Sequence, residues 1–514
     1  MKPIHLVFLP LVLASAAALA ADPTADEIAA LKAQIAQMQA QLDAQKAQLD
    51  KIVAARQSDK VASQDAPKVS MSYGRPTIAN ADGTSTIAFR AIVQGDAAHY
   101  EQDQTGPLTT DFRRGSVGGT AANPNRENSS ARDLDDGMFF RRARAGVEGL
   151  IDRDFQYKFI YEFGGSAGTE GPARINDAWV AYNGFAPFAI QVGAGAPSAG
   201  LDDATTPEDL LFLERATSSD LSRSLAGADG RTGVIFKGSG ARWFGSFAFT
   251  GRTVNDAETN DSQRALVGRL AGLVFTSSDY NLHIGASESY VLRPPDAGVD
   301  HALFGSSARY GIRFRTQPEL RVDSTRLIDT GTIDTDHASA TGVEIAGNWR
   351  NFLFEAENFW FDVSRRTGNL PDPSFNGYYV QGSWVITGES HRYNMATASY
   401  QNPRPYTNFT SSGGLGAWEL AVRYSDTDLN YHEGVQGVAT PSGGIRGGEQ
   451  SVWTIGLNWY PNPNLKFMFD YLHIDVNRLN PSPTAFGPAP QSPPVGVEIG
   501  QTLEAYALRT QYAF

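Results

Sequence analysis

The segment from Tyr506 to Phe514 alternates in side-chain character, and this alternation constrains the fold more than any other feature of the chain. Tyr506, Leu508, Thr510, Tyr512 and Phe514 alternate with Ala507, Arg509, Gln511 and Ala513. Neighbouring side chains of a β-strand point to opposite faces. One face of this strand is therefore mainly apolar and aromatic, and the other is small or polar. A strand between lipid and water has this pattern, although an edge strand of a soluble sandwich produces a similar one.

The composition agrees with a membrane barrel. The chain has 514 residues, of which 41% are hydrophobic and 11% aromatic, and it contains 51 glycines. In a transmembrane barrel only every second strand residue meets lipid, so such a protein is polar overall yet rich in Gly, Tyr and Phe. Past residue 20, no stretch approaches the roughly 20 apolar residues that a membrane-spanning helix needs. A helical membrane protein is therefore not expected.

The first twenty residues have the features of a secretory signal peptide. Lys2 precedes an apolar run that ends in Ala18-Leu19-Ala20, and we expect cleavage before Ala21. The chain has no cysteine, so neither a disulfide nor a thiolate metal site is expected. No other metal site or cofactor is expected either. The net charge of −13 argues against a nucleic-acid partner, since binding of phosphates needs clustered cations.

A helix and a linker are predicted ahead of the barrel. Spacings of three and four between apolar residues predict a coiled coil over residues 21–55, with Ile28, Leu31, Ile35, Met38, Leu42, Gln45, Leu49 and Ile52 at the seam. A single amphipathic helix lying on a surface is the alternative. A helix this short is marginal alone, which favours self-association. Residues 56–85, with Pro67, Gly74 and Pro76 among polar residues, are predicted to be a flexible linker.

Residues 86–514 alternate between strands of roughly ten residues and loops rich in Gly, Asn, Asp and Pro, as in an outer-membrane barrel. Three further strands repeat the parity of the last one: Phe155, Tyr157, Phe159, Tyr161 and Phe163; Trp418, Leu420, Val422 and Tyr424; and Trp453, Ile455, Leu457 and Trp459. Their aromatic residues lie near the strand ends, as in an interfacial girdle. We therefore expect the chain in a bacterial outer membrane, with Phe514 at the end of the closing strand.

Two lengths of connection indicate two rims of a barrel. Residues 149–153 and 461–464 form short turns, whereas residues 101–137 and 477–500 form long loops, as expected of periplasmic and outer faces. At roughly 26 residues per strand and connection, residues 86–514 correspond to about 16 strands, a number typical of water-filled porins. The predicted fold class is an all-β transmembrane antiparallel barrel, preceded by a periplasmic coiled-coil helix.

Four segments carry a resemblance to a known family. They are FRRARAGVEG at 140–149, GYYVQGSWVITGE at 377–389, GAWELAVRYS at 416–425 and GLNWYPNPN at 456–464. With these segments in family order, the chain resembles the outer-membrane phosphate-selective porins O and P. The resemblance implies a homotrimer of 16-stranded barrels, each with a pore that an inward-folded third loop narrows. It also implies passive diffusion of small anions such as phosphate or polyphosphate. A coiled coil ahead of the barrel occurs in many relatives.

Arginines recur on the face expected to line the lumen. If the aromatic face meets lipid, the other parity points inward, and it includes Arg142, Arg144, Arg309, Arg313, Arg315, Arg423 and Arg509. Arginine stays charged and forks onto phosphate-like oxygens, so a column of arginines would favour anions. Facing lipid at mid-depth, each would cost roughly 2–4 kcal/mol. In the alternative, these arginines pair with Glu148, Glu344, Glu355 and Glu357 and only hold the lumen open.

The expected constriction loop, residues 196–230, departs from the family. It carries seven carboxylates, Asp202 and Asp203 among them, against only Arg215 and Arg223, and it contains no lysine. Family members that select phosphate place lysines in this loop. A general, weakly selective pore is therefore the alternative to an anion pore.

Other classes of function find less support in the sequence. The eight histidines show no HExxH spacing and no His-x-His pair, and we find no local serine motif, so no enzyme is expected. Residues 133–137 are acidic but lack the full ligand spacing of a calcium loop. A structural protein, whose coil binds periplasmic or cell-wall components, is the last alternative. The other expected partners are outer-membrane lipid, further copies of the chain and small anions.

Overall fold

The computed structural model describes residues 24–102, 134–165, 173–255, 260–304, 307–366, 368–482 and 495–514, with only the backbone at residues 55–65. The predicted signal peptide, residues 1–20, lies outside the described residues. The chain divides into two compact units, Met1–Pro67 and Lys68–Phe514.

The first unit contains one helix, α1 (Ala25–Asp65). At its start, the backbone N–H of Thr24 donates a hydrogen bond to the Glu27 carboxylate (3.0 Å). The apolar seam residues from Ile28 to Ile52 are exposed along its length. Among the described residues, no helix combines the length and apolar character needed to cross a membrane.

The flexible linker predicted over residues 56–85 is not found. Residues 56–65 continue α1, because they contain neither glycine nor proline to stop it, and the helix ends just ahead of Pro67. Strands β1 (Lys68–Ser72) and β2 (Arg75–Ala79) then pair as a hairpin. Tyr73 and Gly74 connect them with φ of 48° and 73°, the positive values that a two-residue hairpin turn of type I′ requires.

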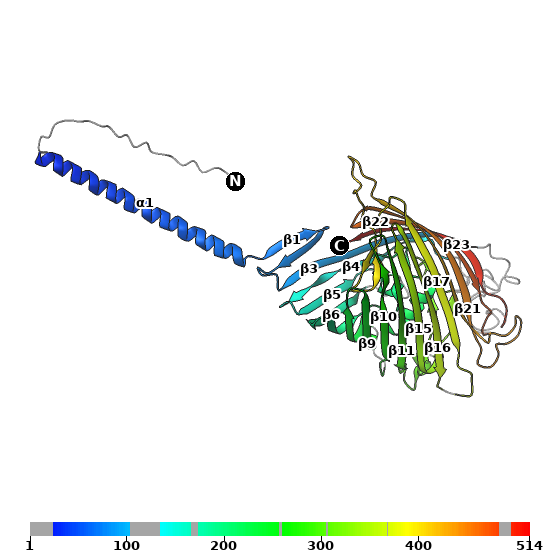
Figure 1. Ribbon diagram of the computed structural model, residues 1–514. Coiled ribbons are helices and arrows are strands. Elements are labelled where there is room, and N and C mark those ends of the chain that lie inside the picture. The colour runs from blue at the N-terminus through cyan, green and yellow to red at the C-terminus, as the bar shows by residue number, and fades with distance from the viewer. Residues whose placement is uncertain are drawn as a thin grey trace, which may run out of the picture. The chain divides into compact units, whose positions relative to one another are not determined.

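The second unit is a closed antiparallel barrel (Figure 1). Its 19-stranded sheet consists, within the described residues, of the hairpin β1–β2, the two-residue strand β12 (Gly311–Ile312) and sixteen barrel strands. The barrel strands are β3 (Thr86–Gln102), β4 (Gly137–Ile151), β5 (Phe155–Glu162), β6 (Arg174–Phe185), β7 (Phe188–Gly195), β8 (Arg231–Ser239), β9 (Trp243–Thr253), β10 (Arg264–Thr276), β11 (Tyr280–Arg293), β15 (Ile333–Trp349), β16 (Phe352–Arg365), β17 (Ser374–Val385), β20 (Ala417–Tyr431), β21 (Ile445–Asn462), β22 (Leu465–Asn477) and β23 (Gln501–Ala513).

Pairing of the last barrel strand with the first closes the barrel. The register between β23 and β3 runs from Leu503 opposite Gln102 to Ala513 opposite Ile92. Closure leaves no barrel strand edge open to lipid, where unpaired backbone groups would be costly. The predicted closing strand and the predicted number of strands are both confirmed.

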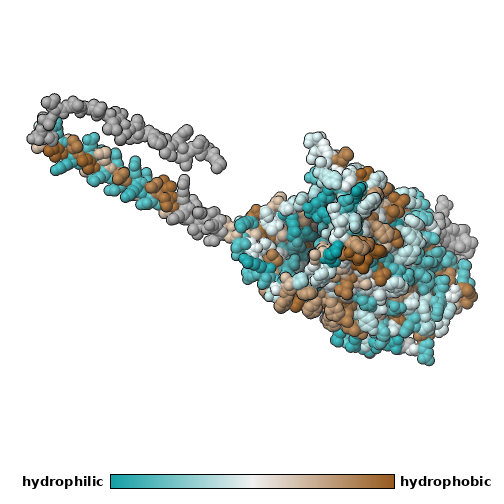
Figure 2. Space-filling view, in the orientation of Figure 1, coloured by the Kyte–Doolittle hydropathy of each residue, from teal (hydrophilic) through white to brown (hydrophobic). Residues whose placement is uncertain are grey.

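Aromatic side chains form two rows on the outer surface of the barrel. In one row, rings stack from Trp349 to Phe352 and Trp384, and from Trp418 to Trp459 and Phe467. In the other, Tyr424 contacts Tyr378 and Trp453, and Tyr471 contacts Tyr506. Trp418 and Tyr424 lie six positions apart on β20, about 20 Å along the strand, so the two rows flank an apolar band as in an outer-membrane barrel. On the face shown in Figure 2, hydrophobic side chains gather over the strands.

The connections define a short-turn rim and a long-loop rim. Residues 149–153 and 461–464 lie on the short-turn rim, whereas the strand ends that the connections β3–β4 and β22–β23 join lie on the opposite rim. One connection on the short-turn rim is long: residues 386–416 join β17 to β20 and contain β18 (Arg392–Asn394) and β19 (Ser399–Gln401). We call residues 386–416 the short-rim insert.

The segment with Arg309, Arg313 and Arg315 is not a barrel strand, and this corrects the prediction. It belongs to the long-rim connection 294–332 between β11 and β15, which contains η2 (His301–Phe304), β12, β13 (Arg315–Thr316) and β14 (Ile328–Asp329). Alternation alone misleads here, because Phe314 inserts between the inner-wall rings of Phe361 and Phe375. The local pattern therefore matches that of a membrane strand although the segment packs inside the barrel.

Candidate functional site: the lumen and its constriction

The connection between β7 and β8, residues 196–230, folds into the barrel and narrows the lumen. It contains α2 (Leu201–Ala204) and α3 (Thr217–Ala226), and α3 contacts the inner wall from β10 to β20. The Glu357 carboxylate on β16 accepts hydrogen bonds from the backbone N–H groups of Leu201 (2.6 Å) and Asp202 (3.0 Å). This is the inward third loop that the resemblance implies, and we call residues 196–230 the constriction loop.

Buried Glu214 anchors this loop to the arginines of the wall. Its carboxylate contacts Arg141 Nε (2.6 Å), Arg509 Nη2 (3.0 Å) and Arg321 Nε (3.4 Å). Burial alone would raise the pKa of Glu214, but the nearby guanidinium groups, Arg141 first among them, outweigh burial and lower its pKa. Glu214 therefore stays ionised and holds the loop by charge-assisted hydrogen bonds.

A β-bulge determines which arginines of β4 face the lumen. Gln94 of β3 pairs with Arg142 while the next residue, Gly95, pairs with Phe140, so Arg141 is the extra residue. A bulge re-aims side chains, and Arg141, Arg142 and Arg144 are all buried. The sequence pattern places Arg142 and Arg144 inward, but it does not show that the side chain of Arg141 is buried inside the barrel as well.

The predicted lumen arginines of the strands mostly pair with carboxylates. Arg509 forms two hydrogen bonds with Asp96 (both 2.6 Å). Arg423 binds Glu319, and Arg144 binds Glu162 (2.6 Å) and Asp229 (2.8 Å). Arg142 donates to Gln94 (2.7 Å) and has no ion-pair partner among the described residues.

The carboxylates expected to pair with these arginines have other partners. Glu344 binds Arg269 (2.8 Å) and His283 (2.9 Å). Glu148 binds Arg75 and lies 3.8 Å from Arg90. Glu355 accepts a hydrogen bond from Gln381 (2.6 Å). Ion pairs between arginines and carboxylates inside the barrel therefore exist, as in the alternative drawn from the sequence. Most of them, however, join other partners than those that the sequence suggested.

Charged side chains of the constriction loop largely have partners, some within the loop and some on the wall. Arg223 binds Asp203 (2.7 Å) and Asp229 (3.2 Å). Arg215 donates to the backbone oxygens of Asp202 (3.0 Å) and Thr205 (2.6 Å). Asp202 is buried. The acidic composition of this loop is therefore a poor measure of the charge that a solute meets.

Arg309, Arg313 and Arg315 lie in the connection 294–332 on the long-loop rim. Arg309 binds Asp296 (2.7 Å) and Arg313 binds Asp329, while the Arg315 side chain is exposed. The acidic stretch 133–137 falls partly outside the described residues, and its Asp136 binds His99 and the backbone N–H of Tyr100 (2.8 Å).

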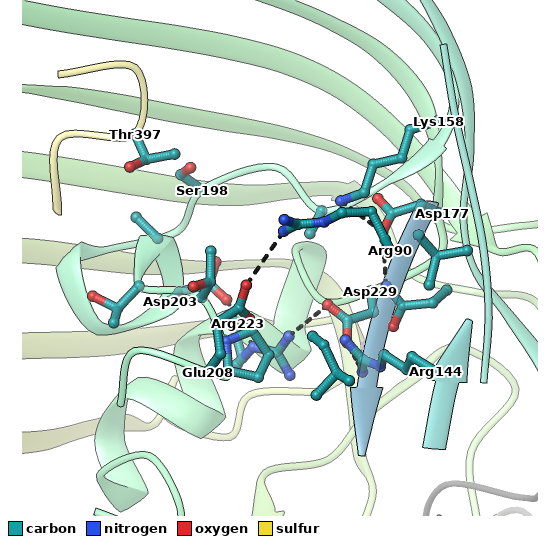
Figure 3. Close-up of a pocket in the computed structure, with 18 of the residues that line it drawn as sticks. Arg90, Arg144, Lys158, Asp177, Ser198, Asp203, Glu208, Arg223, Asp229 and Thr397 are labelled. Carbon is teal, nitrogen blue, oxygen red and sulfur yellow. Dashed lines mark hydrogen bonds and ion pairs between the residues drawn. The ribbon is translucent and has the colours of Figure 1, made fainter. Parts of the chain in front are cut away.

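An open cavity of about 270 Å³ lies between the constriction loop and the opposite wall, formed by β3–β8 (Figure 3). The wall contributes Arg90, Arg144, Lys158 and Lys237 together with Asp177, Trp179 and Gln191. The loop contributes Ser198, Asp203, Glu208, Arg223 and Asp229. Arg90 Nη2 lies 3.3 Å from Glu208 Oε1, an ion pair that joins wall and loop across the cavity.

The short-rim insert reaches the same cavity from the other end. Arg269 donates to the backbone oxygens of Thr397 and Ala398 (both 2.8 Å). The backbone N–H of Asn402 donates to Asp209 of the constriction loop (2.9 Å). Thr397 lines the cavity. The cavity is thus lined by two segments that enter the barrel from opposite rims.

Comparison with known proteins gives the family. A profile of the family described as "phosphate-selective porin O and P" matches residues 115–487. The chain belongs to this family. The porin therefore belongs to the bacterial outer membrane, in agreement with its closed barrel.

Relatives and solved structures resemble this porin at low identity. It is 27% identical over 364 residues to an uncharacterised protein of Caulobacter vibrioides, and the match covers 68% of this chain and 65% of that protein. It is 22% identical over 356 residues to Porin O of Pseudomonas aeruginosa, covering 67% and 78%. The anion-selective porin from Comamonas acidovorans has 11% identity and a TM-score of 0.44, covering 84% and 100%. The outer membrane channel DcaP of Acinetobacter baumannii has 10% identity and a TM-score of 0.43, covering 84% and 97%.

Three wall cations of the porin, Arg90, Lys158 and Lys237, are absent from the predicted pore residues. Parity would have found two of them: Lys158 alternates with Tyr157 and Phe159, and Lys237 follows Phe236 on a short apolar strand. For Arg90, no sequence signal shows that it opposes Glu208, 118 positions further along the chain.

Proposed function

We propose that this protein is a passive diffusion pore for small anions across the outer membrane. The observation that carries the proposal is the cationic wall of the cavity, formed by Arg90, Lys158 and Lys237. Cations beside a narrow passage act on a solute at short range, within the screening length of about 8 Å at physiological salt. The wall charge therefore matters more than the net charge of −13.

The predicted arginines divide into two roles in this proposal. Arg144 and Arg509 hold the constriction loop to the wall through ion pairs with Asp229 and Glu214. Arg423 forms an ion pair with Glu319 of the connection 294–332. Exposed Arg315 provides positive charge at the long-loop rim, where Arg309 and Arg313 pair with Asp296 and Asp329. The homotrimer and the coiled coil of α1 also belong to the proposal, and the exposed apolar seam of α1 supports them.

Reversal potentials of the purified protein in asymmetric KCl test the proposal. We expect chloride to permeate better than potassium. Replacing Arg90, Lys158 and Lys237 together by glutamine should reduce this preference strongly. Arg350→Gln, which removes an exposed arginine from a turn of the short-turn rim, is the matched control and should change nothing. A cation preference in the unmodified protein would overturn the anion pore.

A general, weakly selective pore is the second candidate. Four carboxylates, Asp177, Asp203, Glu208 and Asp229, line the same cavity as the cations. Near-equal permeability of chloride and potassium would favour this candidate.

A further inference from the structure

The cations that line the cavity differ in how far their charge is neutralised. Lys158 lies 3.2 Å from Asp177, and Arg90 lies 3.3 Å from Glu208. Lys237 has no carboxylate within ion-pair distance among the described residues. Its Nζ lies 3.2 Å from the neutral Gln191 Oε1. Arg215 also has no carboxylate within ion-pair distance among the described residues, but its guanidinium group donates hydrogen bonds to backbone oxygens of its own loop. Lys237 is thus the wall cation with the most charge left for a solute.

An indole ring lies beside this ammonium group. Lys237 Nζ is 5.3 Å from the centroid of the Trp179 ring. The indole N–H of Trp179 donates to Asp177 Oδ1 (3.1 Å), and Asp177 in turn binds Lys158. This chain of contacts holds the ring in place. Trp179 is the one aromatic residue among the described residues that line the cavity.

A fixed aromatic ring in a water-filled passage offers apolar surface to a solute. Aromatic rings bind other rings and hydrocarbon groups in offset contacts, and removal of apolar area from water is favourable. A bare inorganic oxyanion has no carbon skeleton with which to use this surface. Across the cavity, Ser198 and Thr397 supply hydroxyl groups to a polar substituent (Figure 3).

We propose that Lys237 and Trp179 form a subsite for small organic anions, with the acid group on the Lys237 ammonium and the carbon skeleton on the Trp179 ring. This inference rests on the proposed anion pore and names the class of solute that it favours. Gln191 and Asp177 are positioning residues, because they hold Lys237 and Trp179 through direct contacts.

Block of chloride current through bilayers by benzoate and by inorganic phosphate tests the subsite. We expect benzoate to block the unmodified protein at lower concentration than phosphate. Trp179→Ala should raise the half-blocking concentration of benzoate about tenfold, equivalent to ~1.4 kcal/mol, and that of phosphate less than twofold. Trp179→Phe should retain most of the benzoate block. Lys237→Gln should weaken block by both anions.

The outcomes separate this inference from the proposed function. If Trp179→Ala leaves benzoate block unchanged, or if phosphate blocks the unmodified protein better than benzoate, the subsite is wrong although the anion pore stands. A cation preference of the unmodified protein would contradict both the subsite and the anion pore. The heat-dependent mobility shift of a folded barrel checks each variant. If Trp179→Ala does not assemble, Trp179→Leu keeps apolar bulk without the flat ring and is subject to the same criterion.

Discussion

Glu214 shows how one buried carboxylate organises several guanidinium groups. Arg141 and Arg509 reach it from β4 and β23, and Arg321 reaches it from the connection 294–332. Each of these arginines is costly to bury alone, and each is stabilised by the shared carboxylate. The constriction loop is therefore held by charge pairing.

Glu214→Gln should loosen the constriction loop. Loss of one member of a buried charge cluster costs about 3–5 kcal/mol, because the arginines remain buried without their partner. We expect a lower temperature for the heat-dependent mobility shift and more frequent current fluctuations. Glu101→Gln, at an exposed position near the long-loop rim, should change neither. Unaltered fluctuations in Glu214→Gln would show that the backbone contacts of the loop suffice.

The pH dependence of this anchor follows from the direction of its pKa shift. The pKa values of Glu214 and Asp229 lie below those of free carboxyl groups, because the opposing arginines outweigh burial. A lowered pKa gives stability that is present above the unfolded pKa and is lost as pH falls through the folded value. We therefore expect constant open-channel fluctuations from pH 7 to about pH 5, with loop release only in stronger acid. A transition between pH 5 and 6 in noise recordings would contradict this assignment.

The Arg90–Glu208 pair across the cavity should limit both current and selectivity. Glu208→Gln removes a carboxylate from the passage and leaves the Arg90 charge available to solutes. We expect higher conductance and a larger chloride preference in reversal-potential measurements. Glu498→Gln, in the long-rim connection between β22 and β23, serves as the control. A smaller chloride preference in Glu208→Gln would mean that Glu208 mainly positions Arg90.

At the scale of elements, two connections from opposite rims meet inside the barrel. The constriction loop lines the cavity from one side. The short-rim insert adds Thr397 to the cavity and forms hydrogen bonds with the loop at Asp209 and Ala204. Hydrogen bonds between side chains and backbone groups of these two segments satisfy polar groups that would otherwise be buried without partners. The insert thus supports the constriction loop from the side of the short-turn rim and also narrows the lumen.

Replacing residues 392–401 by a short Gly-Ser turn should widen the passage. The barrel strands β17 and β20 remain paired with each other, so we expect the heat-dependent mobility shift to persist. Conductance should rise, since Thr397 leaves the cavity and the constriction loop loses contacts. An unchanged conductance would show that the constriction loop alone sets the current.

At the scale of the whole molecule, the chain combines a helix unit with a barrel unit. The exposed apolar seam of α1 would be buried if copies of the helix associate, whereas the barrel closes within one chain. In the proposed function, conduction and self-association therefore reside in different units. The two can be separated by deletion.

Deletion of residues 25–65 tests this division. We expect the barrel to insert and conduct with unchanged single-pore current, and the oligomer to dissociate in detergent at a lower temperature. Loss of conduction would show that the helix is needed for pore assembly. An oligomer of unchanged stability would instead favour binding of α1 to another periplasmic component.

The sequence alone predicted the barrel, its closing strand, the two rims and the family, but only part of the site. Parity places Arg142, Arg144, Arg423 and Arg509 inward, and their side chains are buried in the structure; their part in selectivity stays a prediction. Arg141 escaped prediction because a one-residue bulge reverses the parity around it. The segment around Arg313 was misassigned, since an inward-folded loop that packs Phe314 against the wall has the same alternation as a strand.

What the sequence by itself determined is local: a period of two residues follows from the geometry of a β-strand, so each strand carries the signal that separates its lipid face from its lumen face. The tertiary structure decided which charges remain available to a solute. Arg509 pairs with Asp96, 413 positions away, and Arg90 opposes Glu208 across the cavity. Such pairs exist only once the barrel has closed and two connections have folded into it. For this reason the sequence indicates an arginine-rich lumen, while the structure shows that Lys237 lines the cavity without a carboxylate at ion-pair distance among the described residues.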